Sequence, residues 1–334
     1  MIQQTHTVLP KVSWQTQLAQ AIKEPEVLLS RLGIQQQLPQ LDPTLLAQFP
    51  LKVTHSYLSK MQYGNPDDPL LRQVFPLIDE SYAVSGFTFD PVGDKQAIRQ
   101  AGLLQKYQGR ALLLLTGACA IHCRYCFRRH FSYADSNPIA QQWSTTMAAL
   151  QQDNSINEVI FSGGDPLILS DDKLGQLIND LAQIPHLKRL RIHSRLPIVL
   201  PDRITTTLCR LLHDSRLDII MVVHANHAQE LAADVANAMA RLRPGCLLLN
   251  QSVLLKGIND SVETLATLSE RLSHLGVTPY YLHLLDPVAG ASHFDVSTSR
   301  GIALIQQLRS ELSGYLVPRL VKELAGHDSK TLIA

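Results

Sequence analysis

From residue 111 onward, short apolar runs alternate with longer segments that have the hydrophobic spacing of helices. The apolar runs are Ala111–Leu115, Glu158–Ser162, Arg189–His193, Ile219–Val223, Leu247–Val253 and Pro279–Leu284. The helical segments lie near 138–150, 170–184, 202–213, 227–242, 260–274 and 298–312. Apolar strands that alternate with helices form parallel βαβ units with a buried sheet. The sequence therefore predicts an α/β fold.

Six such units favour a partial (β/α)6 barrel over a closed barrel of eight strands, and an open doubly wound sheet is the alternative. Ser170 and the stretch Asn259–Ser261 have the composition of helix N-caps followed by acidic first turns. We expect three parts: an N-terminal helical region (1–85), a barrel core (86–300) and a C-terminal segment (301–334). In either architecture, functional residues gather at the carboxyl ends of the strands.

Three of the five cysteines follow the first predicted strand at the spacing C-x3-C-x2-C: Cys119, Cys123 and Cys126. Three thiolates are one short of a closed tetrahedral site, so an iron–sulfur cubane on them would keep one iron open to another ligand. A zinc site is the alternative, and it needs a fourth ligand such as His122 or His130. The isolated Cys209 and Cys246 are predicted to be buried apolar residues.

The charges are balanced overall but unevenly distributed along the chain. With 30 Lys+Arg and 29 Asp+Glu, the net charge of +1 disfavours a dedicated nucleic-acid or polybasic membrane protein. No secretory signal is evident and no apolar stretch reaches the ~20 residues of a membrane span, so we expect a cytoplasmic protein. Between Lys95 and Ala134 there is no acidic residue. We expect this positive stretch to favour thiolates and anions, with a nucleic-acid patch as the alternative.

Polar residues follow nearly every predicted strand. The second strand ends in Phe161–Pro166, which contains two glycines that let the backbone approach a neighbour closely. The next strands end in His193–Pro197, His224–His227, Asn250–Ser252 and His283–Pro287. Since parallel strands place these ends on one face, the sequence predicts one shared site there.

The cysteine loop, with Tyr125 before its third cysteine, resembles the signature of radical S-adenosylmethionine enzymes. The turn Gly163-Gly164-Asp165-Pro166 resembles the motif with which these enzymes bind the methionyl amino group. A closer resemblance, to lysine 2,3-aminomutases, lies in Cys123–Phe131, Phe161–Pro166, Arg191–Pro201, Asn250–Asp260 and Ser313–Pro318. The short N-terminal part and the C-terminus resemble the bacterial branch that acts in (R)-β-lysylation of elongation factor P.

This resemblance implies three cofactors: a [4Fe–4S] cluster, S-adenosylmethionine and pyridoxal 5′-phosphate. The three cysteines would hold the cluster, and Lys330 in the C-terminal segment would form a Schiff base with pyridoxal phosphate. Arg128 would hold the substrate carboxylate in a bidentate pair. Asp286 would clamp the ε-ammonium of lysine. Glu323 stands where the family has a second clamping aspartate, and its extra methylene changes its reach.

The resemblance also assigns further cofactor contacts. Lys106, Tyr107 and Arg110 would line the pyridoxal phosphate site, with Arg110 as a phosphate partner. The glycine turn would contact S-adenosylmethionine through Gly163, Gly164 and Asp165. Three residues would face one of the two cofactors without being apportioned between them: His224, Asn250 and Gln251.

The implied function is an isomerase that converts L-lysine to β-lysine by migration of the amino group. The product would supply modification of elongation factor P through its lysyl-transferring ligase, and we expect a monomer or homodimer. One alternative is a radical S-adenosylmethionine enzyme of other chemistry that uses no pyridoxal phosphate. Another is a zinc- or cluster-stabilised binding protein without turnover.

Overall fold

The computed structural model describes residues 12–37, 43–100, 102–133 and 143–334. Six parallel strands pair with their neighbours in chain order and form the centre of the sheet. They are β3 (Arg110–Thr116), β4 (Glu158–Gly163), β5 (Arg189–Ser194), β6 (Asp218–Val223), β7 (Leu247–Val253) and β8 (Thr278–His283). All six predicted strands are therefore present, and the prediction of an α/β partial barrel is confirmed.

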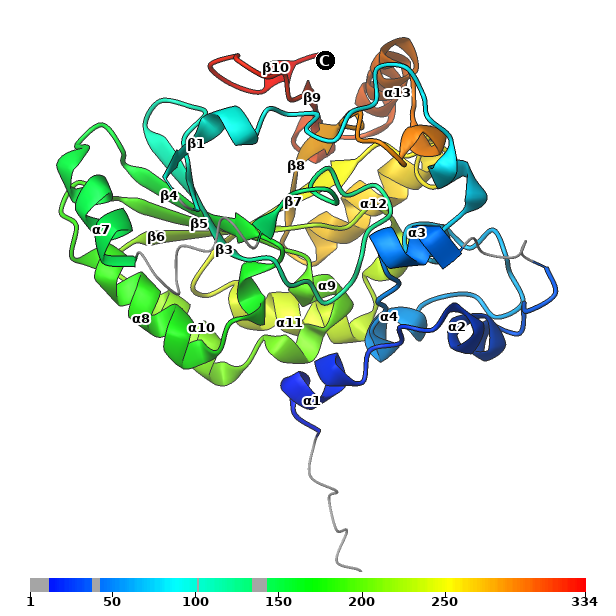
Figure 1. The fold of residues 1–334 in the computed structure, drawn as a ribbon, viewed down its shortest axis with the longest axis horizontal. Coiled ribbons are helices and arrows are strands. Elements are labelled where there is room, and N and C mark those ends of the chain that lie inside the picture. The colour runs from blue at the N-terminus through cyan, green and yellow to red at the C-terminus, as the bar shows by residue number, and fades with distance from the viewer. Residues whose placement is uncertain (1–11, 38–42, 101, 134–142) are drawn as a thin grey trace, which may run out of the picture.

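Each of these strands is followed by a helix that covers the outer face of the curved sheet (Figure 1). The helices are α7 (Trp143–Gln152), α8 (Asp171–Ala182), α10 (Thr206–His213), α11 (Ala233–Leu242), α12 (Val262–His274) and α13 (Thr298–Glu311). Part of the helix expected from 138 lies outside the described residues. Ser170 caps α8 by accepting from Lys173 N, and Ser261 caps α12 by accepting from Thr264 N, as predicted.

Four short strands extend the sheet at its two edges. Strands β1 (Ile98–Gln100) and β2 (Leu103–Leu104) are antiparallel and join the β3 edge. Strand β9 (Arg319–Lys322) is parallel to β8, and β10 (Thr331–Leu332) is antiparallel to β9. The sequence did not predict β9, which adds a seventh parallel strand. This strand brings the C-terminal segment back to the barrel (Figure 1).

The N-terminal region consists of short helices that share the core of the barrel. They are α1 (Trp14–Ala19), α2 (Pro25–Leu32), α3 (Pro43–Gln48), α4 (His55–Leu58) and α5 (Pro69–Arg72). Prolines begin α2, α3 and α5, where the missing backbone N–H costs no intrahelical bond. The buried side chains of Leu28 and Tyr57 belong to the same apolar cluster as Leu113 of β3 and Ile192 of β5. The N-terminal region is thus packed onto the barrel.

Candidate active site

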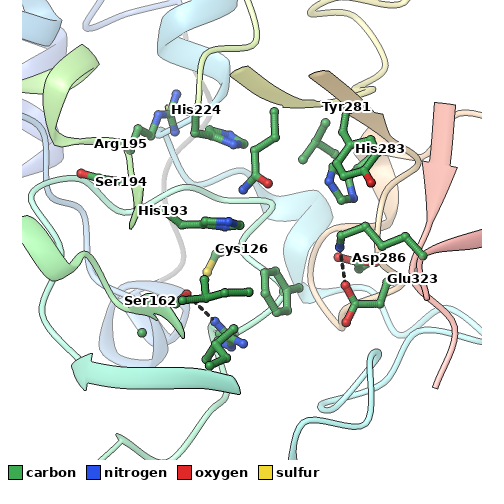
Figure 2. A pocket seen from close by; sticks show the side chains of 18 of the residues that line it. Cys126, Ser162, His193, Ser194, Arg195, His224, Tyr281, His283, Asp286 and Glu323 are labelled. Carbon is green, nitrogen blue, oxygen red and sulfur yellow. Dashed lines mark hydrogen bonds and ion pairs between the residues drawn. The ribbon is translucent and has the colours of Figure 1, made fainter. Parts of the chain in front are cut away.

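A cavity of about 460 Å³ lies at the carboxyl ends of the barrel strands (Figure 2). Its walls come from the loop after β3, the ends of β4 to β8 and the C-terminal segment around β9 and β10. Predicted site residues that line it are Cys119, Cys123, Cys126, Lys106, Tyr107, Arg110, Arg128, Gly163, Gly164, Asp165, His224, Gln251, Asp286, Glu323 and Lys330. The fold therefore gathers almost all of the predicted site in one cavity.

The cysteine loop is anchored by the N-terminal region. Arg124 is fully buried, and its Nε and Nη2 donate to the Glu80 carboxylate at 2.7 and 2.5 Å. Arg129 Nη2 donates to the same carboxylate at 2.8 Å. Lys52 Nζ donates to Cys119 O at 2.6 Å, so both ends of the loop are held. The sequence assigned no chemistry to residues 1–85, and these contacts show that this region positions the cysteines.

The pKa values of Cys119 and Cys126 differ from the sequence expectation. Burial, together with repulsion by the neighbouring thiols, raises the pKa of Cys119 well above its usual value and that of Cys126 to about 11. The expectation that local positive charge favours thiolates is therefore wrong for Cys119 and Cys126. Three half-buried thiols on one short loop fit a cationic group that would draw off their protons.

The positions of the three cysteines favour an iron–sulfur cluster over a single metal ion. Within the described residues, no three histidine, cysteine, aspartate or glutamate side chains could hold one metal ion. A mononuclear zinc site needs its ligands to converge on one point. In a cubane, each cysteine binds a different iron, so the thiols need not converge. The three cysteines thus fit a [4Fe–4S] cluster better than the zinc alternative.

The arginines of the cysteine loop pair with acids inside the protein. Arg128 Nε donates to Asp94 Oδ2 at 2.6 Å, and Arg124 and Arg129 share the Glu80 carboxylate. Because buried acids from other segments pair with these three arginines, they do not form a free basic patch, which weakens the nucleic-acid alternative. Cys209 and Cys246 pack against the apolar core, as expected of apolar residues, but they are half-buried where the sequence predicted buried side chains.

The glycine turn at the end of β4 fits tightly against the cysteine loop. Gly163 has φ +119°, and a Cβ on it would lie 2.5 Å from Thr116 O. A Cβ on Gly164 would lie 2.3 Å from Ala118 O. Glycine is therefore required here for approach to the backbone of the loop, besides any ligand contact.

Asp165 has a positioning role at the strand ends. Its Oδ1 accepts from Leu167 N and Ser194 Oγ, and its Oδ2 accepts from Arg195 N and Leu196 N. Burial raises the pKa of Asp165 to about 6, although these hydrogen bonds oppose the rise. With both oxygens occupied by the protein, Asp165 ties the end of β4 to the end of β5.

The opposite side of the cavity carries a chain of alternating charges. Lys330 Nζ donates to Glu323 Oε2 at 2.5 Å, and Glu323 Oε1 accepts from Lys106 Nζ at 2.8 Å. Lys106 Nζ also lies 2.7 Å from Asp94 Oδ1, and Asp94 pairs with Arg128. Burial raises the pKa of Glu323, but Lys330 and Lys106 outweigh it and hold that pKa at about 2. Glu323 is therefore already shared by two lysines.

Asp286 differs from Glu323 because it has an unused acceptor. Its Oδ1 is buried and has no hydrogen-bond partner within the described part of the chain. Burial and the nearby Glu323 carboxylate raise the pKa of Asp286 to about 7, despite Lys330 and Lys106. A buried carboxylate without a partner is costly, so this position fits a cationic group of a ligand.

Two donors without a partner line the same cavity as Lys330 and fit pyridoxal phosphate. Arg110 Nε and Tyr107 OH are both buried without a hydrogen-bond partner among the described residues. The Arg110 guanidinium lies 5.0 Å from the centre of the Tyr107 ring. An arginine suits a phosphate group and a lysine suits an aldehyde, so these residues could hold this cofactor.

The three unapportioned residues are placed differently. His224 lines the cavity, and its Nε2 lies 2.8 Å from Tyr125 OH. Gln251 also lines the cavity. Asn250 is not among the lining residues of the described chain, because its side-chain amide is bonded to Ala225 N and O. It therefore joins the end of β7 to the end of β6 and does not line the cavity.

Several cavity residues were missed as site residues. His193 and His283 line the cavity, and each has a buried Nε2 without a partner in the described ranges (Figure 2). Their positions at strand ends were a usable signal. Arg195 also follows a strand and contacts a cysteine of the loop. Asp94 gave no such signal, because its contacts come from residues that are distant in the sequence.

A partial (β/α)6 barrel with a three-cysteine loop after its first parallel strand defines the radical S-adenosylmethionine class of iron–sulfur enzymes. Residues 108–190 match a family model described as a 4Fe-4S single cluster domain. Among solved structures, a radical SAM methyltransferase from Sphaerobacter thermophilus has a TM-score of 0.44 and 16% identity, with coverage of 66% of this chain and 68% of that one.

The particular family follows from curated relatives. The chain is 48% identical to an L-lysine 2,3-aminomutase of Escherichia coli (strain K12), covering 95% of this chain and 93% of the relative. It is 43% identical to that of Haemophilus influenzae, covering 100% and 99%. The enzyme of Clostridium subterminale is 35% identical, covering 84% and 68%. The chain belongs to the L-lysine 2,3-aminomutase family, which confirms the predicted isomerase class.

The comparisons also bear on the cofactors and on membrane association. Family membership and the matched cluster domain confirm the predicted [4Fe–4S] cluster and S-adenosylmethionine. In the described part of the chain, no helix has the length and apolar character needed to span a membrane.

Proposed function

We propose that this protein isomerises L-lysine to β-lysine by moving the amino group from C2 to C3. The observation that carries the proposal is the buried, unpartnered Oδ1 of Asp286 in the cavity that also contains the cysteine loop and Lys330. An anionic acceptor there fits the ε-ammonium of lysine. The matching cationic group for the substrate carboxylate is Arg128, which lines the same cavity.

Two cofactor systems supply the difficult chemistry in this proposal. The three cysteines would hold the cluster, which together with S-adenosylmethionine would supply the means to remove a hydrogen atom from C3. Lys330 would hold pyridoxal phosphate in the absence of substrate, and this cofactor would supply a π system to the substrate nitrogen for its migration between neighbouring carbons. The protein contributes binding, orientation and exclusion of water.

Arg128 is held in a fixed orientation before the substrate binds. Its Nε donates to Asp94 Oδ2, and its Nη1 donates to Ser162 Oγ at 3.1 Å. The guanidinium plane also lies over the Phe127 ring at 4.7 Å. A guanidinium with a preset plane loses little freedom when it binds a carboxylate. Arg128 can therefore orient the α-carboxylate, and with it C2 and C3.

Asp286 and Glu323, the two acids at the lysine end of the cavity, have different roles in this proposal. Asp286 has a free acceptor and binds the ε-ammonium directly in this proposal. Glu323 keeps Lys330 Nζ directed into the cavity through their hydrogen bond, and its low pKa means that it stays ionised. Since a buried carboxylate is costly without a cation, a substrate without the ε-ammonium should be rejected.

We also propose the biological context that the family resemblance implies. The product would be (R)-β-lysine, supplied to the ligase that modifies elongation factor P in the cytoplasm, and the enzyme would be a monomer or homodimer. The short N-terminal part and the C-terminus, which resemble that branch, support this context. Deleting the gene should remove the β-lysyl mass from elongation factor P. An unchanged mass spectrum would contradict this context.

The direct test is anaerobic incubation of the reconstituted enzyme with L-lysine, S-adenosylmethionine, pyridoxal phosphate and a reductant. Chiral chromatography should detect β-lysine, and omission of any one cofactor should abolish it. A protein with intact cluster that cleaves S-adenosylmethionine but forms no β-lysine would contradict the proposal. That result would favour a radical enzyme of other chemistry.

A further inference from the structure

A buried arginine contacts the cysteine loop from the end of β5. Arg195 is 7% exposed, and its Nη1 donates to Cys123 Sγ at 2.7 Å. Its Nη2 donates to Glu230 Oε2 at 3.0 Å and to Gln73 Oε1 at 2.7 Å. One guanidinium thus joins a cysteine of the cluster to a carboxylate and to the N-terminal region.

The surroundings hold the Arg195 guanidinium in one place. It lies 5.4 Å from the centre of the Tyr57 ring and 5.7 Å from that of Tyr125, and these rings are themselves buried. Its backbone N donates to Asp165 Oδ2 at 2.8 Å. A donor fixed by stacking and by its own backbone can keep the same distance to a sulfur through a reaction cycle.

The carboxylate that pairs with Arg195 belongs to Glu230, which is fully buried. Besides Arg195, it accepts from Asn226 N at 2.8 Å and from His227 N at 3.1 Å. A buried ion pair adds little to stability on balance, because desolvation offsets the attraction. A pair of this kind placed against a cluster ligand therefore calls for a role other than stability.

We propose that the Arg195–Glu230 pair sets the reduction potential of the [4Fe–4S] cluster through the hydrogen bond to Cys123 Sγ. Reduction adds one negative charge to the cluster. Arg195 stabilises that charge and raises the potential, whereas Glu230 opposes it and lowers the potential. Hydrogen bonds to cluster sulfurs and local net charge are established determinants of such potentials. Arg195 and Glu230 are then positioning residues that act through Cys123.

A rival role for Arg195 is binding of the S-adenosylmethionine carboxylate. Its Nε is buried, lacks a hydrogen-bond partner within the described chain and belongs to a residue that lines the cavity. The two roles separate when the potential is measured without S-adenosylmethionine. The proposal needs the cluster but neither pyridoxal phosphate nor lysine, so it can fail independently of the proposed isomerisation.

The test is a redox titration of the reconstituted full-length protein, monitored by the electron paramagnetic resonance of the reduced cluster, without other ligands. Arg195→Met should shift the potential to more negative values, and Glu230→Gln should shift it to more positive values. Arg195→Lys should retain part of the wild-type value.

The matched control is Arg203→Met. Arg203 is fully buried, and its guanidinium donates to Leu167 O, Leu169 O and Asp171 Oδ1 rather than to a cysteine of the loop. This control should leave the potential unchanged.

Iron content is measured alongside the potential. Arg195→Met leaves Glu230 without a cation and could lose iron for that reason. In that case the double variant Arg195→Met/Glu230→Gln is measured in its place, and its potential should be more negative than that of Glu230→Gln alone. Potentials equal to wild type in both single variants would overturn the proposal, as would shifts of the same sign. Weaker S-adenosylmethionine binding with an unchanged potential would assign Arg195 to the rival role.

Discussion

The two ends of the cavity are built in different ways. At the cluster end, the loop from Cys119 to Cys126 is contiguous and is fixed by buried partners such as Glu80 and Lys52. At the lysine end, the groups come from segments far apart in the sequence, and Asp286 Oδ1 lacks a partner within the described residues. The cluster end is thus preorganised by the protein, whereas in the proposed function the lysine end is completed by its ligands.

The largest expected effect is at the cluster end. Cys126→Ala should abolish both stable iron binding and turnover, because two thiolates cannot hold a cubane. Iron analysis and the spectrum of the reduced cluster measure this directly. Cys209→Ala is the control, since that cysteine is a half-buried residue packed against the core. Retained iron in Cys126→Ala, or lost iron in Cys209→Ala, would contradict the assignment.

Replacement of Lys330 should abolish turnover and leave the cluster end of the cavity unchanged. Lys330→Ala should bring β-lysine formation to the uncatalysed level while the iron content stays at the wild-type value. Borohydride reduction with peptide mass mapping should find a phosphopyridoxyl group on Lys330 of the wild type. The matched control is the exposed Lys256, whose alanine variant should keep the label on Lys330. A wild-type label on another lysine would refute the proposed role.

Loss of the free acceptor should weaken lysine binding strongly. Asp286→Asn should raise KM for lysine by ~30- to 1000-fold, since an unpaired buried charge costs about 2–4 kcal/mol. The exposed Asp295 offers a control, and Asp295→Asn should leave KM unchanged. Similar KM values in wild type and Asp286→Asn would place the ε-ammonium elsewhere.

The raised pKa of Asp286 gives lysine binding a pH dependence. A carboxyl with pKa about 7 is protonated below that pH and cannot attract an ammonium. Lysine affinity, measured calorimetrically, should therefore fall by up to ~10-fold per pH unit below about 7 and level off above it. The profile should flatten in Asp286→Asn. A wild-type affinity that stays constant from pH 5 to 8 would disagree with an ionising clamp.

The smallest expected effect is that of Glu323. Because Lys106 and Lys330 already share its carboxylate, Glu323→Gln should raise KM for lysine by only ~10-fold, or about 1.4 kcal/mol. The comparison with Asp286→Asn is decisive, since the two variants remove equal charges. A larger effect at Glu323 would reverse the proposed division of work between the two acids.

The sequence predicted what is encoded locally. The six strands have apolar runs, and the cluster ligands have a short spacing. Strand β9, in contrast, begins with Arg319 and ends with Lys322, which hides its two buried apolar residues from a pattern search. The thiol pKa values were misjudged because burial and the neighbouring cysteines, which raise the pKa of Cys119 and Cys126, are set by the fold. Partners such as Glu230, which lies 35 positions from Arg195, appear only in the fold.

The central claim is that both ends of the cavity serve one reaction on one substrate. The most direct measurement uses L-lysine carrying deuterium at C3, incubated anaerobically with all three cofactors and a reductant. Mass spectrometry should find deuterium in the adenosyl group of S-adenosylmethionine and at C2 of β-lysine. Formation of β-lysine with no deuterium in the adenosyl group would contradict a radical passing between the two ends.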